Sequence, residues 1–591
     1  MTLTKVAFRP GIHKDLTQLS SEGSFYDCEK VRFRDGLPEN IGGWRKLLET
    51  GVTGIPREVH TWANNAGSKI TAIGTSKKLY LFYGNQFFDI TPLDDSGTLG
   101  SNPFTTNAAG SAVVTVNDTA HGRAAGDYIH FTGTTGPIDG IPASEFNTEL
   151  TVTSVIDNDN YTITLTTTAT AGSVSGGGSG VDYEYEIGIG KDSTSYGYGY
   201  GAGTYNLGTW GTPRSSSNVT LDLRVWSLDN WGEDLLCMPR GGNLYVWDAT
   251  NGPETRATLV SNAPTGEFFL VDPNNREVIV FGEDGDPVGI KWCDQNDYTN
   301  WTASATTTAD ERRLLKGAKI VGALLTKGEI LIWTDVSLHG MQFTYSGDFV
   351  YALRDIGQNC GLLGINAAAV HGTTAWWMGN NKNFYIYDGR VRVLQSPLRR
   401  EVFDNLDFEQ KDKVYAGLNS AHTEIWFFWQ STAGSENDRY TIFNYGEAVW
   451  YHGTLERTAW ADKDVYDYPL ALDSSGYLFE HEYGYNDDGS ALESWVESGD
   501  FDLGDGDVIM FMNGVIPDFT ITGTGLLTLK ARKYPNTEQI TKGPIDVTSS
   551  TKYVKPRLRG RQCAMRFGSN EVDAQWRFGK LRFDLRPDGG N

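Results

Sequence analysis

Three dense groups of acidic residues are the first candidates for chemistry in this sequence. They read DNDN at 157–160, EDGD at 283–286 and GDFDLGDGD at 499–507. Carboxylate oxygens at such density are the ligands that Ca²⁺ prefers in proteins. None of the three groups has the spacing of an EF-hand loop, and Asp-Gly pairs are common in hairpin turns. We therefore interpret them as turns, and the sequence predicts no bound metal and no cofactor.

Carboxylates also cleave glycosidic bonds when two of them flank one sugar. With 74 acidic residues some pair is always available, so composition alone does not exclude a glycosidase. The stretch SLDNWGED, beginning at Ser227, is the nearest match to the aspartate box of sialidases, but its glycine is misplaced and the Thr-Trp pair is missing. The nine histidines are isolated, and the chain has neither H-E-x-x-H nor the phosphate-binding G-x-x-x-x-G-K-[ST] motif. The sequence therefore predicts no catalytic residue.

The elements that would position any site are short strands that recur along the chain. A turn followed by an apolar, aromatic strand occurs in stretches such as GGNLYVWDAT (241–250), KGEILIWTD (327–335) and NKNFYIYDGRVRVL (381–394). Beyond Val225 the repeated units begin near residues 225, 267, 312, 365, 413 and 458. A period of roughly 45 residues with several strands is typical of a β-propeller blade. We predict an all-β fold with a propeller of six or seven blades; the alternative is an irregular all-β protein whose strands look alike.

The period is interrupted by residues 93–215, which are rich in Thr, Ser and Gly. Two stretches, AVVTVNDTAHGRAAGDYIHFTGT and TELTVTSVIDNDNYTITLTTTAT, each predict a pair of strands joined by a glycine turn. They indicate a small β module inserted into a propeller loop, where added length costs little closure entropy. The stretch YGYGYGAGTYNLGTWG (196–211) that follows resists regular packing. We interpret it as a long functional loop; the alternative is a rim packed on its own propeller.

The two ends of the chain differ from the propeller in pattern and in charge. The protein has a formal net charge of -24, yet residues 551–591 contain ten Lys or Arg and only four Asp or Glu. Residues 580–586 alternate strictly between charged and apolar side chains, which predicts a strand with one buried and one charged face. We expect a terminal β-sandwich, here called the platform. The predicted domains are 1–50 (N-terminal segment of the platform), 51–92 (first blade), 93–215 (inserted module and Gly/Tyr-rich loop), 216–489 (remaining blades) and 490–591 (C-terminal platform).

The five cysteines are scattered and show no C-x-x-C spacing, which argues against a disulfide scaffold or a thiolate metal site. The first residues form no apolar signal region, and no run of 18 apolar residues occurs. We therefore expect a protein that folds in a reducing cytosol and has no membrane anchor.

Several long stretches resemble one known family. The opening FRPGIHKDLTQLSSEGSFYDCEKVRFRDGLPENIGGWRKL, the stretches WSLDNWGEDLLC, KWCDQNDYTNWTA and CGLLGINAAAVHGTTAWWMGNNKNFYIYDG, and the ending WRFGKLRFDLRPDGG are similar to tail nozzle proteins (tail tubular protein B, or tail hub) of short-tailed bacteriophages. The resemblance covers most of the chain and is weakest over residues 93–215. It implies a homohexameric ring in the virion tail, assembled in the host cytoplasm. It also implies an adaptor protein above the ring, attached fibres or spikes, a central DNA channel and a distal gate.

Two functions from different classes remain open. As a structural conduit, an acidic ring would repel phosphate and let DNA pass without specific binding. As an adsorption protein or polysaccharide-degrading propeller enzyme, the chain would bind host glycans, and Trp62, Trp210 and Trp231 would be candidate sugar platforms. The tryptophans have an alternative interpretation as ordinary propeller core.

The conduit hypothesis predicts two sets of functional residues, one for the interface with a neighbouring protein and one for the channel gate. The basic strands of the platform would bind carboxylates of an adjacent subunit or of the adaptor, since the planar guanidinium holds a carboxylate bidentately. The alternative is an ordinary solvated sheet face. Candidates for this interface are Arg557, Arg559, Arg561, Lys580, Arg582 and Arg586, and candidates for the channel gate are Tyr198, Tyr200 and Tyr205.

The gate hypothesis gives a first prediction. If the tyrosines of the Gly/Tyr-rich loop close the channel, deletion of residues 196–206 will give particles that leak DNA after packaging, because nothing else fills the constriction. Quantifying packaged DNA in purified virions measures this. Full particles with normal ejection would rule the gate out.

Overall fold

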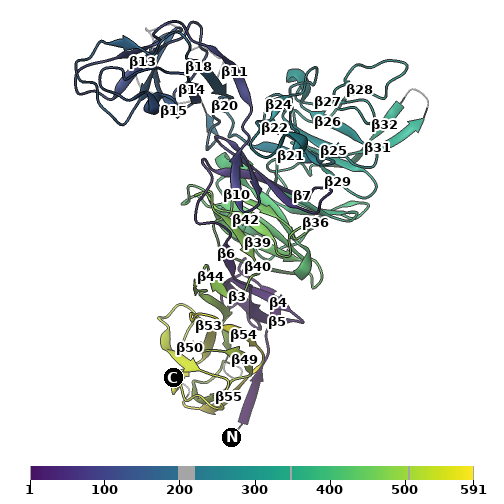
Figure 1. Cartoon of the computed structure of the whole chain (residues 1–591). Coiled ribbons are helices and arrows are strands. Elements are labelled where there is room, and N and C mark those ends of the chain that lie inside the picture. The colour runs from purple at the N-terminus through teal and green to yellow at the C-terminus, as the bar shows by residue number, and fades with distance from the viewer. Residues whose placement is uncertain (1, 197–219, 347–348, 503–505, 590–591) are drawn as a thin grey trace, which may run out of the picture.

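The computed structural model describes residues 2–196, 220–346, 349–502 and 506–589. The molecule is elongated and almost entirely β (Figure 1). The platform with both chain ends lies at one end, the propeller follows, and the inserted module projects beside the propeller at the other end. The predicted fold class is confirmed: an all-β propeller with an inserted β module and a terminal β-sandwich.

The propeller has seven four-stranded blades, so the upper of the two predicted blade numbers is correct. Blades 1 to 4 consist of β7 (Pro56–Ala63), β8 (Lys69–Thr75), β9 (Leu79–Tyr83) and β10 (Gln86–Asp89); β21 (Trp226–Trp231), β22 (Asp234–Pro239), β23 (Tyr245–Trp247) and β24 (Thr258–Leu259); β25 (Phe268–Asp272), β26 (Glu277–Phe281), β27 (Gly289–Trp292) and β28 (Asp310–Arg313); and β29 (Ile320–Leu325), β30 (Ile330–Thr334), β31 (Ser337–Ser346) and β32 (Phe349–Gln358). Blades 5 to 7 consist of β33 (Ala368–His371), β34 (Thr374–Met378), β35 (Phe384–Tyr387) and β36 (Val391–Leu394); β37 (Tyr415–Asn419), β38 (Glu424–Gln430), β39 (Asn437–Asn444) and β40 (Val449–Thr454); and β41 (Ala459–Ala461), β42 (Leu470–Leu472), β43 (Leu478–His481) and β6 (Trp44–Lys46).

The first strands of the blades pack against one another in ring order, and β41 of blade 7 returns to β7 of blade 1. The predicted unit starts lie within a few residues of these first strands, except the start near 312. That position falls in β28, the outer strand of blade 3, and the first strand of blade 4 begins only at Ile320.

A strand from the N-terminal segment closes the ring. β6 pairs antiparallel with β43 as the outer strand of blade 7, with His481 opposite Trp44 and Glu480 opposite Arg45. Trp44 is only 3% exposed, donates its indole N–H to Asp487 Oδ1 at 2.7 Å, and stacks on His481. Blade 7 therefore depends on residues at both ends of the propeller sequence, and the short β44 (Asn486–Asp487) and β45 (Ser490–Ala491) extend it past β6.

The inserted module leaves the propeller after β10 and returns before β21. Its eight strands follow the order β11 (Leu93–Thr98), β18 (Asp182–Glu186), β14 (Tyr128–Thr132), β15 (Glu149–Val155), β16 (Asn160–Thr164), β13 (Val113–Asn117), β12 (Phe104–Thr106) and β17 (Ser175–Gly176). It has its own core around Phe104, Phe131 and Tyr161, separate from the propeller core. The short pair β19 (Ser195–Tyr196) and β20 (Thr220–Leu221) follows the module.

One strand pairing predicted for the module is wrong. β15 pairs with β16 as expected, but β13 and β14 do not pair: β13 lies between β16 and β12, and β14 lies between β15 and β18. The ten residues between β13 and β14 form an open loop held by Asp127, whose carboxylate accepts the N–H of Ala124. Such a loop lets the chain cross to a different part of the sheet, which a tight hairpin turn does not.

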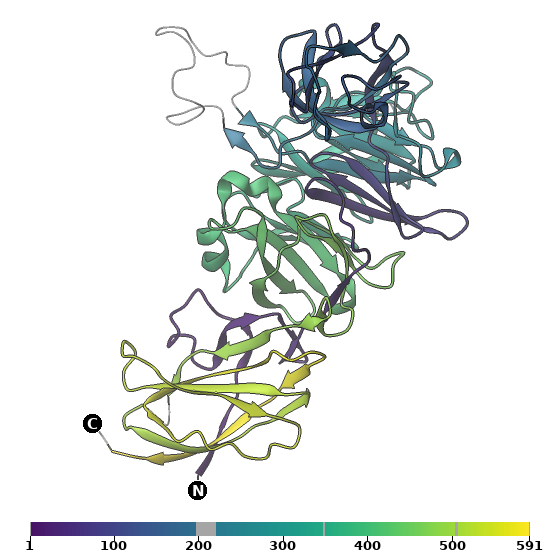
Figure 2. The same ribbon diagram turned by 60° about the vertical axis from the view of Figure 1, so that its left-hand side comes forward.

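The platform is built from both ends of the chain (Figure 2). The terminal sheet has the strand order β1 (Thr2–Val6), β55 (Leu581–Pro587), β48 (Met510–Ile516) and β52 (Leu558–Gly560). The middle sheet has the order β2 (Arg9–Ile12), β3 (Ser24–Glu29), β46 (Ser494–Ser498), β53 (Gln562–Ser569), β50 (Gly525–Arg532) and β51 (Ile540–Val547), and β47 (Phe501–Asp502) also pairs with β53. The neck sheet has the order β4 (Val31–Arg34), β5 (Leu37–Asn40), β54 (Gln575–Phe578) and β49 (Phe519–Thr522). Phe567, Phe578 and Phe583 from the three sheets belong to one apolar cluster, which continues into blades 5 to 7. Platform and propeller therefore share a core.

Helices are few. Residues 396–413 contain α2 (Arg399–Asn405) and the 3₁₀ turn η3 (Phe408–Lys413). The remaining short helices are α1 (Ala143–Phe146), η1 (Ala249–Asn251), η2 (Glu283–Gly285) and η4 (Ser420–His422). In the part of the chain that the structure describes, no helix is long and apolar enough to cross a membrane.

Closure by β6 gives a second prediction. Trp44→Ala will destabilise the propeller by about 3–5 kcal/mol, the cost of deleting a large buried aromatic side chain. Hydrogen exchange will become faster in β41, β42 and β43, because the blade loses its outer strand. Trp231→Ala removes a partly exposed tryptophan of blade 2 and serves as the control. Unchanged protection of blade 7 in the Trp44 variant would contradict this role for β6.

Candidate functional site

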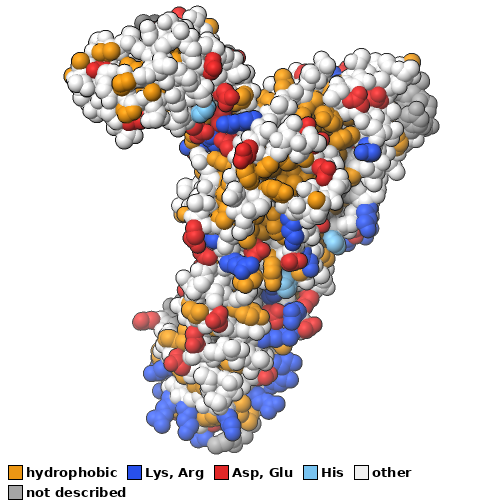
Figure 3. Space-filling model, viewed as in Figure 1, with side chains coloured by type: hydrophobic (Ala, Val, Ile, Leu, Met, Phe, Trp, Pro, Cys, Tyr) orange, Lys and Arg blue, Asp and Glu red, His pale blue; other side chains and the backbone are white. Residues whose placement is uncertain are grey.

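Of the sites that the sequence predicts, the outer face of the terminal sheet is the most basic surface. Lys and Arg side chains gather over this end of the molecule (Figure 3). Lys5 in β1 lies directly opposite Arg582 in β55, and Arg586 and Arg559 lie on either side of Phe511 in β48. Register and burial therefore place these four cations on one face, since Leu581, Phe583 and Leu585 between them point into the core.

Two of these cations are left without a counter-charge by the fold. Arg559 pairs with Asp588 at 2.8 Å. Arg586 reaches Asp584 only at 3.9 Å, and 54% of its side chain is exposed. Lys5 and Arg582 have no acidic partner among the described residues. Like charges directly opposite each other on a sheet destabilise it, so the arrangement is not explained by the stability of the sheet.

The remaining predicted interface residues are distributed around this face. Lys580 is exposed and precedes β55, while Arg557 is exposed, has a φ of 50° and precedes β52. Arg561 lies beyond β52, where its guanidinium stands 5.2 Å from the ring of Tyr534. Arg557, Arg559 and Arg561 therefore do not lie on one strand: β52 comprises Leu558–Gly560, and of the three only Arg559 shares the face of Arg582 and Arg586.

Asp584 also departs from the predicted pattern of one uniformly exposed charged face. Only 1% of the residue is accessible, and its carboxylate accepts a hydrogen bond from Asn513 Nδ2 at 2.8 Å. That hydrogen bond, assisted by the charge of Arg586, lowers the pKa of Asp584. The single acid of the strand is thus occupied within the sheet and neutralises little of the basic face.

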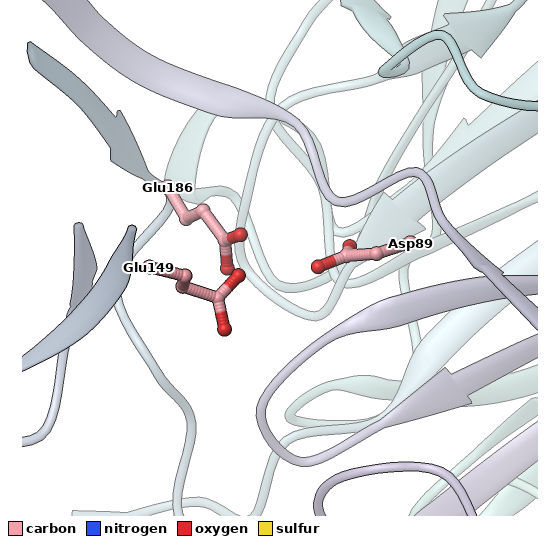
Figure 4. Close-up of side chains that lie close together, drawn as sticks. All are labelled: Asp89, Glu149 and Glu186. Carbon is pink, nitrogen blue, oxygen red and sulfur yellow. The ribbon is translucent and has the colours of Figure 1, made fainter. Parts of the chain in front are cut away.

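A second charged centre lies at the junction between blade 1 and the inserted module. Asp89 at the end of β10 approaches Glu149 of β15 and Glu186 of β18 (Figure 4). One carboxylate oxygen of each lies within 4.8 Å of those of the others, the only such group of three or more potential metal ligands among the described residues. Three convergent carboxylates are ligands suited to a divalent cation.

The protein supplies its own cation there. Lys78 Nζ lies 2.6 Å from Asp89, 2.6 Å from Glu149 and 3.1 Å from Glu186. Arg256 adds contacts to Asp89 at 3.2 Å and Glu186 at 2.7 Å. The ammonium therefore fills the position that a metal would take, and the cluster fastens the module to the propeller.

The pKa shifts of this junction follow from burial and charge. Burial would lower the pKa of Lys78, but Asp89 and Glu186 outweigh it and the pKa is raised. Burial raises the pKa of Glu186, with a further contribution from Asp89, whereas Arg256 and Lys78 overcome burial and lower the pKa of Asp89. The ammonium is thus firmly protonated, and Glu186 is the carboxylate that most readily takes a proton. Nothing in the sequence singles out these five charges, which lie far apart along the chain.

The axial channel of the propeller is a third candidate. It is a cavity of about 470 Å³ lined by the first strands of blades 1 to 6. Burial raises the pKa of Glu58 to about 7. Its carboxylate accepts hydrogen bonds from Tyr415 at 2.9 Å and Asn366 at 2.7 Å. Burial also raises the pKa of Asp229, which accepts the N–H of Val271. These bonds fix both carboxylates to the channel wall.

The acidic groups interpreted as turns make hydrogen bonds both within the turn and to other segments. Asp157 accepts the N–H of Asp159, Asp286 accepts that of Val288, and Asp284 accepts that of Thr265. In the third group Asp502 accepts from Gln562, and residues 503–505 lie outside the described residues.

The tryptophans proposed as sugar platforms fall into three situations. Trp62 is 4% exposed and donates to the carbonyl of Glu233, so it is core and not a platform. Trp231 is partly exposed and packs edge-on against Tyr298. Trp210 and the gate candidates Tyr198, Tyr200 and Tyr205 lie outside the described residues.

Searches of family models and of curated proteins find no match to this chain. Among solved structures, the phage phi92 endosialidase is similar with 10% identity and a TM-score of 0.18, over 72% of this chain and 63% of that chain. This chain thus spans less than two thirds of that protein. BamB from Moraxella catarrhalis has 14% identity and a TM-score of 0.27, over 44% and 84% of the two chains. The N-terminal domain of Nup159 has 12% identity and a TM-score of 0.27, over 46% and 79%.

The module junction gives a third prediction. Lys78→Met will lower stability by about 3–5 kcal/mol, because removing the ammonium leaves Arg256 as the only cation for Asp89 and Glu186 among the described residues. The loss will be smaller at pH 5 than at pH 8. Without the ammonium the folded-state pKa values of the carboxylates rise above their unfolded values, so stability is retained at low pH and lost as pH rises. Thermal unfolding at the two pH values measures this.

Lys77→Met, one residue earlier, is the matched control, since no ion pair of Lys77 occurs among the described residues. Equal loss of stability at pH 5 and pH 8 in the Lys78 variant would show that the carboxylates are not left uncompensated.

Proposed function

We propose that this chain is a structural subunit of a short phage tail, a ring-forming nozzle that provides and gates the channel for genome ejection and carries fibres. The resemblance of its opening, blade and closing stretches to tail nozzle proteins supports the proposal, together with an all-β architecture of propeller, insertion and platform. The proposed partners are further copies of the chain in a homohexamer, an adaptor protein, and tail fibres or spikes. The proposed location is the virion tail after assembly in the host cytoplasm.

The observation that carries this proposal is the basic face of the terminal sheet, on which two cations have no acidic partner among the described residues. Lys5 and Arg582 oppose each other on a protein whose net charge is -24. An acidic surface of the adjacent subunit or of the adaptor would supply the missing counter-charges. Charges of this kind steer association and fix its register more than they add affinity. The platform would therefore dock through this face.

The acidic remainder of the chain fits a conduit. Ten basic and four acidic residues beyond 551 leave the rest of the molecule strongly negative. A negative wall repels the phosphates of a passing duplex, so DNA slides without binding. Six copies per particle on the tail axis would support this function. Release of reducing sugar from host envelope would instead support the glycan-degrading alternative.

Charge reversal on the basic face gives a fourth prediction. The double variant Arg582→Glu and Arg586→Glu will fold normally but enter tails at least tenfold less efficiently, because both exposed charges now repel the acidic partner. Incorporation into tails, measured on purified particles, tests this at ordinary salt. In the unmodified protein, assembly will slow as salt rises past about 0.15 M, where the screening length falls to roughly 8 Å.

The control is the double variant Arg400→Glu and Arg439→Glu, which makes the same charge change on exposed arginines of the propeller. Its assembly is expected to be normal. Normal tails from the Arg582 and Arg586 variant would show that the basic face is only a solvated surface.

A further inference from the structure

A polar groove lies at the neck, between the neck sheet of the platform and the loops of blades 6 and 7. Its volume is about 510 Å³, and we call it the neck groove. Its floor is the face of the neck sheet that carries Glu39, Arg577 and Thr520, and its wall includes His422 and Tyr485 of the propeller. Small-molecule sites commonly occupy clefts of about 300–1,000 Å³ between two parts of a chain.

The floor carries an ordered row of polar side chains. Arg32, Glu39, Arg577 and Thr520 are direct cross-strand partners over β4, β5, β54 and β49. Thr522 and Gln575 form the next such pair on the same face. The row therefore presents alternating positive, negative, positive and hydroxyl groups along one line.

Arg32 is committed to the structure. Its guanidinium binds Glu424 bidentately at 2.9 and 3.0 Å and Glu482 at 2.8 and 2.6 Å. These bonds join the neck sheet to blades 6 and 7. Arg32 thus fixes the two walls of the groove and uses four of its five N–H donors for this purpose.

Two other arginines retain donors. Arg34 is 57% exposed at its side chain, and the one ion pair of its guanidinium among the described residues is with Glu39 at 3.6 Å. Arg577 is 32% exposed and donates from Nη2 to Asp35 at 2.9 Å and to the carbonyl of Arg34 at 2.8 Å. It meets Glu39 at 3.7 Å, beyond hydrogen-bond range. Both guanidinium groups flank the same short stretch of the groove.

The rest of the groove offers groups that bind hydroxyls. The side chains of Thr520, Thr522, Gln575 and Tyr485 make no hydrogen bond with any residue that the structure describes. Glu39 adds a carboxylate acceptor, whose pKa is raised by burial against the opposing effect of Arg34 and Arg577. A planar guanidinium matches a carboxylate or phosphate bidentately, whereas threonine, glutamine and glutamate match sugar hydroxyls.

We propose that the neck groove binds a small hydroxylated anion, a sugar bearing a carboxylate or phosphate group. Arg34 and Arg577 take the anionic group, and Glu39, Thr520 and Gln575 take the hydroxyls. Because Arg32 holds both walls in place, the site is formed before the ligand arrives, which lowers the ordering cost of binding.

The test uses the full chain and isothermal titration with four probes: glucuronate, glucose 6-phosphate, glucose and inorganic phosphate. We expect saturable binding of at least one of the two anionic sugars, with glucose and inorganic phosphate at least tenfold weaker. Arg34→Gln will weaken that binding at least tenfold. Arg400→Gln, an exposed arginine of the propeller, is the matched control and will bind as the unmodified protein does.

Comparing the binding of glucuronate with that of glucose 6-phosphate shows whether the groove takes a carboxylate or a phosphate group. Absence of binding by both anionic sugars would overturn the proposal, as would binding of inorganic phosphate as tightly as the sugars, which would indicate an adventitious ion only. Unchanged binding in the Arg34 variant would also overturn it. The melting temperature of the Arg34 variant is measured alongside, and if the variant is unstable, Thr520→Val tests the hydroxyl contacts by the same criterion.

Discussion

The pairing of β6 with β43 is the constraint on which the rest of the molecule depends. β41 of blade 7 packs on β7 of blade 1, and the strand that completes blade 7 comes from the N-terminal segment. The same segment continues backward into β1 to β5 of the platform. Closure of the ring and assembly of the platform are therefore one event, and their shared apolar cluster reflects this.

Buried charges at the two joints follow a common rule. Arg32 at the neck and Lys78 at the module junction are each almost inaccessible, and each is surrounded by several carboxylates. Burying an ion is expensive unless partners satisfy it, so such pairs add little net stability compared with an apolar contact. They require one geometry, however, because a shifted neighbour leaves an unpaired buried charge. These buried charges therefore fix the orientation of the platform and of the inserted module relative to the propeller.

The sequence predicted what depends on local pattern and missed what depends on distant partners. Strand period and turn residues were enough to place most blades and the alternating strand at 580–586, because side-chain alternation is a local property. The closing strand escaped prediction since its three residues, Trp44–Lys46, have no pattern of their own. Lys78, Asp89 and Glu186 resemble ordinary surface charges until the fold brings them together. Asp584 was misjudged because its partner Asn513 lies in another strand.

The pairing of β1 with β55 has a consequence for the order of synthesis. Thr2 to Val6 lie opposite Leu585 to Leu581, so β1 finds its partner only after the whole propeller has been synthesised. At roughly 5–20 residues per second, the ribosome needs on the order of 30–120 s to reach that point. During this interval the N-terminal strands are present without their neighbours, and the blades before β43 cannot yet form a closed ring. A chain that stops before β43 therefore has an incomplete blade 7, and one that stops before β55 leaves β1 without its partner strand.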